Sequence, residues 1–381
     1  MLQFPLIMMK RPLLLAAFLV IFAHTTHAQK TITDSITSGG VMRYYNLYIP
    51  KHYIIGSSRP LIIHLHGYGS NGTIEQVYTN YMPIADTAGF LIVYPQGLVD
   101  ANQHQYWNAG IPGIPKTPDD VAFISELIDS LHVRYTINRS DVYASGLSNG
   151  GYMCYQLAWK LSNKIAAIAS VSGSMAPLEF VKCKPVGAVP VMEIHGTADN
   201  VVPYHASLGT TDIDTLLNFW IINDGCIPLP GITNLPDTDP TDGSTVIRYE
   251  WSAELRNTAC ELYKIVGGTH VDWPGGAGNG NNMDFNASSA IWQFFNRYRL
   301  SQLSVKEKDL PSSFSFYPDP CSGLIHIAAD PPGKVTIVDV AGRKVLTSRE
   351  KNIDVSQLAS GCYQLIFENE GVIKIAKFLK F

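Results

Sequence analysis

One serine in this sequence lies in a pattern that can make it a nucleophile. Ser148 is the central residue of Gly146-Leu147-Ser148-Asn149-Gly150, which follows the apolar stretch Val142–Ala144. A strand that ends in G-x-S-x-G and enters a helix makes a sharp turn, and the glycines leave room for a serine in strained backbone geometry. Because such a pentapeptide also occurs in ordinary turns, its chemistry depends on partners elsewhere in the chain.

A base and an acid that could activate this serine follow later in the chain. Asp199 comes after the apolar run Val189–Ile194, and His270 comes after a second run, Leu262–Val266. An imidazole can take the proton of a serine hydroxyl, and a buried carboxylate can fix the imidazole tautomer. The order serine, aspartate, histidine, each on a loop after a strand, is typical of an α/β-hydrolase triad. Asp272 is a competing acid, but it adjoins His270 on the same loop, so Asp199 is preferred.

A pair of backbone N–H groups must also be placed to stabilise an oxyanion. The apolar run Pro60–Leu65 ends in His66-Gly67-Tyr68-Gly69, close to where the serine loop would lie in such a sheet. We therefore expect the backbone N–H groups of Tyr68 and Asn149 to form the oxyanion hole.

Two tryptophans are candidates for substrate binding. Trp107 and Trp273 both lie in Gly- and Pro-containing loops, and Trp273 is close to His270 in the sequence. A flat aromatic face could bind a sugar, a feruloyl ring or a polyester chain. The alternative is that each indole fixes its loop to the core; the substrate interpretation is slightly favoured for Trp273.

Other polar residues are interpreted as structural. The Asp119-Asp120 pair is expected to cap a helix and to supply charge to its first turn. No H-x-x-x-H spacing is present, so we predict neither a metal site nor a cofactor. Four histidines beside strands or glycine turns are interpreted as structural: His64, His66, His195 and His205.

Apolar strands alternate with helical stretches from Pro60 to about Leu300, which predicts an α/β fold with a doubly wound, mostly parallel sheet. The segment 227–243 is rich in Pro, Asp, Thr and Gly and is expected to be a loop excursion near the active face. Further strands are expected at 41–49, 90–94 and 166–171, and helices at 119–135, 150–161, 211–223 and 287–298.

The amino terminus predicts export. Lys10-Arg11 precedes the apolar run 13–22, and Ala28 closes a small-residue cleavage site, so residues 1–28 are interpreted as a signal peptide. No later stretch is typical of a membrane helix. The formal charge is −4 over 381 residues, which offers no basic patch for nucleic acid.

Export also affects how the six cysteines are interpreted, because disulfides form readily outside the cytoplasm. Six cysteines allow 15 pairings. Cys226 and Cys260 are the preferred pair because they bracket the Pro- and Gly-rich segment, whereas Cys154 is expected to be a buried free thiol.

The chain changes character after residue 300. Residues 29–300 are assigned to the catalytic domain, and the polar stretch 301–313 to a linker. Residues 314–381 show short alternating runs separated by glycine turns, which predicts a small all-β, sandwich-like domain.

The carboxy-terminal part resembles the sorting domain of type IX secretion cargo. The resemblance is carried by Phe316–Pro320, Val338–Val345, Leu358–Tyr363 and Lys377–Lys380, with Asp319 where the family usually has Asn. It implies interaction of residues 314–381 with type IX secretion machinery. It also implies export through the periplasm and outer membrane to the cell surface or medium.

Residues 42–298 resemble secreted esterases of the polyhydroxybutyrate depolymerase and feruloyl or acetylxylan esterase group. That family implies Ser148, Asp199 and His270 as the triad, with the Tyr68 amide in the oxyanion hole. Many relatives have Cys where Tyr68 stands, and this chain has one extra residue between His270 and Trp273. The motifs that carry the resemblance are His66-Gly67-Tyr68, Tyr94–Gly97, Trp107-Asn108, Asp119–Val121, Gly146–Gly151, His195–Asp199 and His270 with Trp273–Gly275.

These observations lead to a functional expectation. The chain is expected to be a secreted serine carboxylic ester hydrolase that acts through an acyl-enzyme, releasing feruloyl or acetyl groups from plant polysaccharide. The alternatives are a depolymerase of polyhydroxybutyrate or another polyester and, more remotely, a peptidase. From another class, the chain could be a non-catalytic surface carbohydrate-binding protein on a hydrolase fold.

Overall fold

The computed structural model describes most of the chain. The predicted signal peptide, Asp272 and most of the predicted linker lie outside the described residues. Within the described ranges, no helix is both long and apolar enough to cross a membrane. The described ranges are 29–253, 257–270, 273–276, 282–303, 315–319, 321–328, 333–339, 343–369 and 372–380.

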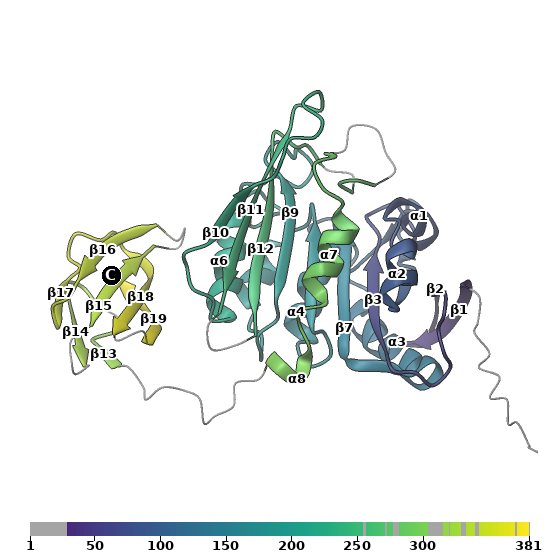
Figure 1. Cartoon of the computed structure of the whole chain (residues 1–381), viewed down its shortest axis with the longest axis horizontal. Coiled ribbons are helices and arrows are strands. Elements are labelled where there is room, and N and C mark those ends of the chain that lie inside the picture. Colours follow the sequence, from purple (N-terminus) through teal and green to yellow (C-terminus); the bar gives the residue numbers. More distant parts are fainter. Residues whose placement is uncertain are drawn as a thin grey trace, which may run out of the picture.

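A ten-stranded sheet forms the centre of the first part of the chain (Figure 1). Its strand order is β1-β2-β4-β3-β7-β8-β9-β12-β11-β10. The strands from β4 to β12 in this order are parallel, whereas β1, β2, β10 and β11 pair antiparallel at the two ends. The strands are β1 (Lys30–Ser38), β2 (Val41–Ile49), β3 (Arg59–Leu65), β4 (Leu91–Pro95), β7 (Ile137–Leu147), β8 (Ala167–Val171), β9 (Val191–Gly196), β10 (Gly231–Asn234), β11 (Thr245–Ser252) and β12 (Ala259–Val266).

The sequence of the central strands explains their position. Leu91–Pro95 and Ala167–Val171 are buried at every residue, as expected for parallel strands covered by helices on both faces. The terminal strand β1 is instead largely exposed or half-buried and carries alternating polar residues. This arrangement confirms the predicted α/β-hydrolase sheet.

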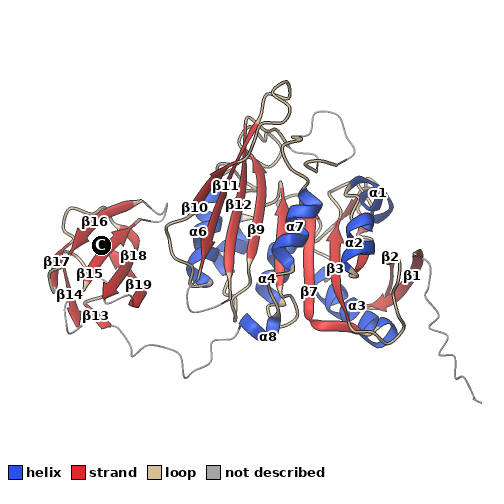
Figure 2. Cartoon of the chain, in the orientation of Figure 1, coloured by secondary structure: helices blue, strands red, loops and turns tan. Residues whose placement is uncertain are grey.

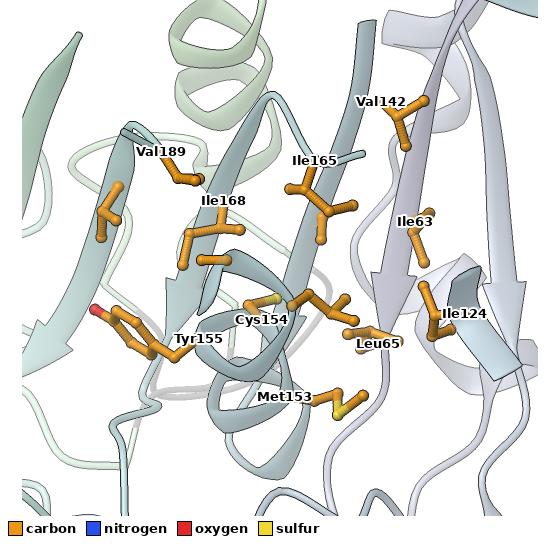
Figure 3. Close-up of a cluster of buried hydrophobic side chains, with 14 of the residues drawn as sticks. Ile63, Leu65, Ile124, Val142, Met153, Cys154, Tyr155, Ile165, Ile168 and Val189 are labelled. Carbon is orange, nitrogen blue, oxygen red and sulfur yellow. The ribbon is translucent and has the colours of Figure 1, made fainter. Parts of the chain in front are cut away.

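Helices cover both faces of the sheet (Figure 2). Helices α3, α4 and α6 contribute to one apolar core (Figure 3), and α2 and α7 contribute to a second core on the opposite face. A two-stranded ribbon, β5 (Leu98–Val99) with β6 (Gln105–Tyr106), lies outside the main sheet. The helices are α1 (Gly72–Tyr78), α2 (Met82–Ala88), α3 (Asp120–Tyr135), α4 (Asn149–Lys160), α5 (Pro177–Lys182), α6 (Ile213–Asn223), α7 (Ala287–Phe295) and α8 (Leu300–Leu303).

Two features differ from the predictions. The segment 227–243 is not only a loop, because Gly231–Asn234 forms the edge strand β10 and pairs with β11. All four residues of β10 are exposed, so no apolar pattern marks it in the sequence. Helix α8 extends into the predicted linker, and its Leu303 is buried.

The carboxy-terminal part contains two antiparallel sheets that share one apolar core. Their strand orders are β13-β14-β17 and β16-β15-β18-β19, and the core includes Ile325 and Ile353 from the first sheet with Ile337 and Leu365 from the second. This confirms a small all-β domain. The strands are β13 (Ser315–Tyr317), β14 (Leu324–Ala328), β15 (Lys334–Val338), β16 (Lys344–Ser348), β17 (Asn352–Asp354), β18 (Gly361–Asn369) and β19 (Val372–Lys380).

Candidate active site

Ser148 occupies the sharp turn between β7 and α4. Its φ of 53° and ψ of −115° lie outside the regions that non-glycine residues favour. Neighbouring backbone atoms lie so close to the two flanking positions that only glycine fits there. A Cβ at Gly146 would lie 2.5 Å from the backbone of Gly150, and one at Gly150 would lie 2.1 Å from the carbonyl oxygen of Leu65. The turn therefore presents the serine hydroxyl at the carboxyl end of the strand.

The structure brings Ser148, His270 and Asp199 into one hydrogen-bonded chain. His270 Nε2 lies 3.2 Å from Ser148 Oγ, and His270 Nδ1 lies 2.7 Å from Asp199 Oδ2. The Asp199 carboxylate is enclosed, whereas the His270 side chain is 25% exposed. A base that reaches both the nucleophile and solvent can pass a proton between them.

The loops that carry Asp199 and His270 are joined by backbone contacts. Thr197 N donates to Ile265 O at 2.9 Å, and Ala198 N donates to Gly268 O at 2.8 Å. Gly196 permits this approach, because a Cβ there would lie 2.3 Å from the Gly268 carbonyl oxygen. These contacts extend the parallel pairing of β9 with β12 past the ends of the strands.

The Asp199 carboxylate is fixed from two sides. Its Oδ1 accepts hydrogen bonds from the backbone N–H groups of Val201 and Val202, at 2.9 and 2.8 Å. Its Oδ2, which faces His270, also lies 3.5 Å from Nε2 of the buried His195. A second imidazole therefore borders the carboxylate that contacts the candidate base.

His195 lies within a buried polar group. Its Nδ1 lies 2.9 Å from Glu193 Oε1 and its Nε2 lies 2.8 Å from the Val202 carbonyl oxygen, so both nitrogens face acceptors. Tyr155 donates to the other oxygen of Glu193 at 2.8 Å. Burial opposes the charge on His195, but the hydrogen bond and charge of Glu193 outweigh it and raise the pKa of His195. The predicted structural role of His195 thus extends to fixing the loop of Asp199.

The two amides predicted for the oxyanion hole flank the serine. A Cβ built on Gly67 would lie 3.7 Å from Ser148 Cβ, which places the loop of Tyr68 directly beside the nucleophile. Asn149 is the first residue of α4, where a backbone N–H has no partner within the helix. The Tyr68 phenol donates to Asp100 and thereby fixes its own loop. The oxyanion hole formed by these two amides stays a prediction.

Trp107 joins the two loops that carry these amides. Its backbone N–H donates to Asn149 Oδ1 at 2.7 Å, and Asn149 Nδ2 donates back to its carbonyl oxygen at 3.0 Å. Its indole N–H donates to the His66 carbonyl oxygen at 3.0 Å. The Trp107 side chain is 0% exposed, so the expectation that it forms a substrate platform is wrong. An enclosed indole holds its neighbours in place rather than contacting a substrate ring.

Replacing Trp107 with phenylalanine should therefore affect turnover more than substrate affinity. The lost indole N–H leaves a buried carbonyl oxygen without its donor, which costs about 1–3 kcal/mol of stability. We expect kcat for p-nitrophenyl acetate to fall by about tenfold with KM nearly unchanged, because the oxyanion donors shift. Steady-state kinetics and urea unfolding measure both effects. A higher KM at unchanged kcat would instead indicate direct substrate contact.

Trp273 is also enclosed, so the expectation that it forms a substrate platform is wrong as well. Its side chain is 0% exposed, and its indole N–H donates to Ser288 Oγ at 2.8 Å. The ring packs edge-on against His64 at 5.0 Å and against Tyr81 at 5.9 Å. Trp273 thus anchors the chain that follows His270 to α7 and to the core. The extra residue between His270 and Trp273 does not prevent this packing.

The neutral form of His66 supports the loop that carries Tyr68. Its Nε2 accepts a hydrogen bond from Gly97 N at 2.9 Å, so its Nδ1 carries the proton and donates to Gly67 O at 2.8 Å. Burial lowers the pKa of His66 to about 4, although the bond to Gly67 opposes this. The unfolded chain binds a proton at this histidine below its ordinary pKa of about 6.5, and the folded chain does not.

Acidification should therefore lower the free energy of unfolding, because the unfolded chain protonates His66 more readily than the folded chain does. The stabilisation of the folded chain by neutral His66 is fully present above about pH 6.5. Lowering the pH from 7 to 5 should remove about 2 kcal/mol of unfolding free energy. His66→Gln keeps an acceptor and a donor without the titration, so its stability should depend less on pH. Urea unfolding at the two pH values measures the difference. His205→Gln, at a largely exposed histidine, is the matched control and should retain the wild-type dependence. Equal pH dependence in wild type and His66→Gln would contradict this role.

Other predictions concern the cap of α3, the cysteines and metal binding. Asp119 caps α3 by accepting from Ala122 N, and Asp120 in the first turn forms a buried ion pair with Arg43. Cys226 and Cys260 carry free thiols here, although the two side chains contact each other, so their disulfide stays a prediction. Cys154 is a buried free thiol, as expected. Among the described residues, no group of three or more His, Cys, Asp or Glu side chains is arranged to hold a metal ion.

Comparison with known families finds one match in each part of the chain. Residues 115–227 match the phospholipase/carboxylesterase family, and residues 315–380 match the secretion system C-terminal sorting domain. The chain has the α/β-hydrolase fold, contains a region similar to carboxylesterases and has a C-terminal region similar to secretion sorting domains. The match to a sorting domain implies that the chain is secreted across an outer membrane.

Curated relatives of this chain include an acetylxylan esterase and a feruloyl esterase. It is 34% identical over 175 residues to a bifunctional acetylxylan esterase/xylanase of Neocallimastix patriciarum, an alignment that covers 46% of this chain and 24% of that protein. It is 26% identical over 286 residues to feruloyl esterase D of Neurospora crassa, covering 71% of this chain and 86% of that protein. The chain thus spans about a quarter of the first relative and about half of another curated relative.

A solved structure supports the fold. The acetyl xylan esterase from Aspergillus awamori superposes with a TM-score of 0.50 at 14% identity, covering 70% of this chain and 99% of that one. At this identity the likeness concerns the α/β-hydrolase fold alone.

Proposed function

We propose that this hydrolase cleaves carboxylic esters through an acyl-enzyme formed on Ser148. The observation that carries the proposal is the chain of hydrogen bonds from Ser148 through His270 to Asp199 at a strained strand–helix turn. This arrangement can raise the nucleophilicity of a serine without a cofactor.

The first half of the reaction transfers the acyl group to the enzyme. Ser148 Oγ attacks the ester carbonyl carbon while His270 Nε2 takes the hydroxyl proton. The backbone N–H groups of Tyr68 and Asn149 donate to the oxyanion of the tetrahedral intermediate. His270 then returns the proton to the leaving alcohol as the carbon–oxygen bond of the ester breaks. Asp199 holds the imidazole tautomer and stabilises the imidazolium.

Water completes the cycle. A water molecule gives a proton to His270 and attacks the acyl carbon, and the second tetrahedral intermediate collapses to release the acid. His270 returns the proton to Ser148 Oγ, so the enzyme is restored. The partial exposure of His270 provides the access that this water requires.

We propose feruloyl or acetyl groups on plant polysaccharide as the acyl groups released. The acetylxylan and feruloyl esterases among the curated relatives support this class, and the sorting domain suits an enzyme that meets a polymer outside the cell. Residues 314–381 would engage type IX secretion machinery. A polyhydroxybutyrate or other polyester depolymerase is the second candidate, because the same acyl-enzyme chemistry cleaves polyester bonds.

Hydrolysis assays on matched substrates separate these candidates. The full chain would be assayed on methyl ferulate, acetylated xylan, p-nitrophenyl acetate and a polyhydroxybutyrate suspension, alongside Ser148→Ala. Release of ferulate or of acetate from xylan supports the polysaccharide esterase, and clearing of the suspension supports the depolymerase. Activity on p-nitrophenyl acetate alone would contradict both polymer assignments.

A non-catalytic carbohydrate-binding role is the alternative from another class. A fluorophosphonate probe reacts with an activated serine but not with an ordinary one. Labelling of the wild-type chain at Ser148 supports the enzyme, whereas absence of labelling would favour the binding protein.

A further inference from the structure

A hollow of about 230 Å³ lies apart from Ser148, between α6 and the antiparallel end of the sheet. Figure 1 shows α6 beside β10 and β11 at that end of the sheet. The residues that line it come from α6, from the segment before β10, and from β11 and β12: Asp214, Leu217, Asn218, Ile221, Pro228, Pro230, Tyr249, Trp251, Leu262 and Lys264. The described contacts of the Ser148 site use none of them.

Two aromatic rings form part of the lining. Tyr249 and Trp251 are two residues apart on β11, so both point to the α6 face, and both are half-buried. Their ring planes are inclined by only 15°, and their centroids are 5.8 Å apart. The two rings are nearly parallel to each other, and an accessible aromatic ring suits the C–H face of a pyranose ring.

Asn218 supplies a polar side chain to the lining of the hollow. Asn218 is only 9% exposed, yet its amide makes no hydrogen bond with any other described residue. Its amide atoms are not among the fully buried polar atoms that lack a partner, so they are open to the hollow, where a ligand can pair with them. The Asn218 amide lines the hollow and can both donate to and accept from a ligand hydroxyl.

Two charged groups complete the lining. The Lys264 ammonium lies 4.5 Å from the ring of Tyr204, and within the described part of the chain no carboxylate forms an ion pair with it. Asp214 accepts from the Tyr204 hydroxyl at 2.6 Å and is otherwise exposed. Lys264 therefore keeps donors, and Asp214 keeps acceptor capacity, for a ligand in the hollow.

From these contacts we infer that the hollow binds a saccharide unit of a polysaccharide, separately from the ester-cleaving site. A purely apolar ligand would leave the Asn218 amide unpaired, and a small anion would make no use of the aromatic pair. A sugar has apolar ring faces and a rim of hydroxyl groups, so it matches both parts of the lining. The volume accommodates about one sugar ring, so a longer chain would extend out of the hollow along the surface.

The function of such a site would be to hold the enzyme on its polymer. A secreted hydrolase that meets an insoluble substrate gains local concentration from a second contact with the same chain. Small soluble esters would not use this contact. Substitutions in the hollow should therefore leave their hydrolysis within about twofold of wild type.

Binding of unesterified oligosaccharides tests the inference. The full chain would be titrated with xylohexaose, cellohexaose and mannohexaose by isothermal calorimetry, together with Trp251→Ala, Asn218→Ala and the control Tyr44→Ala. Tyr44 is 55% exposed on β2, outside the hollow. We expect at least one oligosaccharide to bind, and each hollow variant to weaken it by about tenfold or more while Tyr44→Ala does not.

The outcomes are decisive in both directions. Absence of binding by all three oligosaccharides, or binding that survives either hollow substitution, would overturn the inference. Hydrolysis of p-nitrophenyl acetate reports whether each variant is folded, and Asn218→Ala removes little of the core if Trp251→Ala fails to fold. A wild type that binds an oligosaccharide but hydrolyses no ester would refute the proposed function while leaving this binding site intact.

Discussion

Replacing Ser148 with alanine is expected to lower kcat for p-nitrophenyl acetate by about 10⁴-fold or more. The substitution removes the atom that forms the acyl-enzyme, and no other hydroxyl is hydrogen-bonded to His270 among the described residues. The oxyanion donors and the binding surface remain, so a small residual rate above the uncatalysed reaction should persist. Steady-state kinetics measures the loss.

A matched control separates loss of the nucleophile from loss of the fold. Ser207 is exposed, so Ser207→Ala should keep wild-type activity. Alanine keeps the Cβ, so the backbone strain that the φ of 53° indicates should stay as it is in the wild-type chain. Undiminished hydrolysis by a folded Ser148→Ala chain would contradict the acyl-enzyme.

The second large effect is expected from Asp199→Asn. The asparagine carbonyl oxygen can keep the hydrogen bonds from Val201 and Val202, so the loop should stay in place. Its amide group would then face His270 Nδ1 and donate to it. The imidazole would carry its proton on Nε2, toward Ser148, and could no longer accept the hydroxyl proton. We expect kcat to fall by about 10⁴-fold.

The pH dependence distinguishes this tautomer effect from a disturbed structure. At high pH, hydroxide and the deprotonated nucleophile reduce the need for a general base, so part of the lost rate should return in Asp199→Asn. Thermal unfolding should change little, because the loop contacts are retained. A loss below about tenfold in kcat would mean that Asp199 does not orient His270.

The chain order of the candidate triad could be predicted because each residue has a local signal. Ser148 has a G-x-S-x-G turn, and Asp199 and His270 each follow an apolar strand that ends at the same edge of a parallel sheet. Most residues of these strands are buried, so apolar residues dominate their sequences. Strands β9 and β12 are neighbours, and β8 separates them from β7.

The roles of the tryptophans could not be predicted, because position in the sequence does not determine where a side chain points. Trp107 and Trp273 lie on loops near the site, yet both indoles turn into the protein, where His66 O and Ser288 Oγ accept their N–H groups. Proximity to His270 was no guide to exposure. The partner of a buried indole is set by the tertiary fold.

The residues that support Asp199 also have a signal in the sequence. Glu193 and His195 alternate within the otherwise apolar strand β9, so both point to the α4 face, where Tyr155 donates to Glu193. Charged residues two apart in a buried strand indicate a buried pair. The edge strand β10 left no comparable signal, because its four exposed residues show no apolar alternation.

The most direct test of the central claim is to trap the acyl-enzyme. The full chain would be mixed rapidly with p-nitrophenyl acetate, quenched in acid, digested and examined by mass spectrometry. We predict an initial burst of p-nitrophenol together with an acetyl group on the peptide that contains Ser148, and neither in Ser148→Ala. Rapid turnover with no acetylated peptide, or acetylation at another residue that supports the same rate, would contradict nucleophilic catalysis by Ser148.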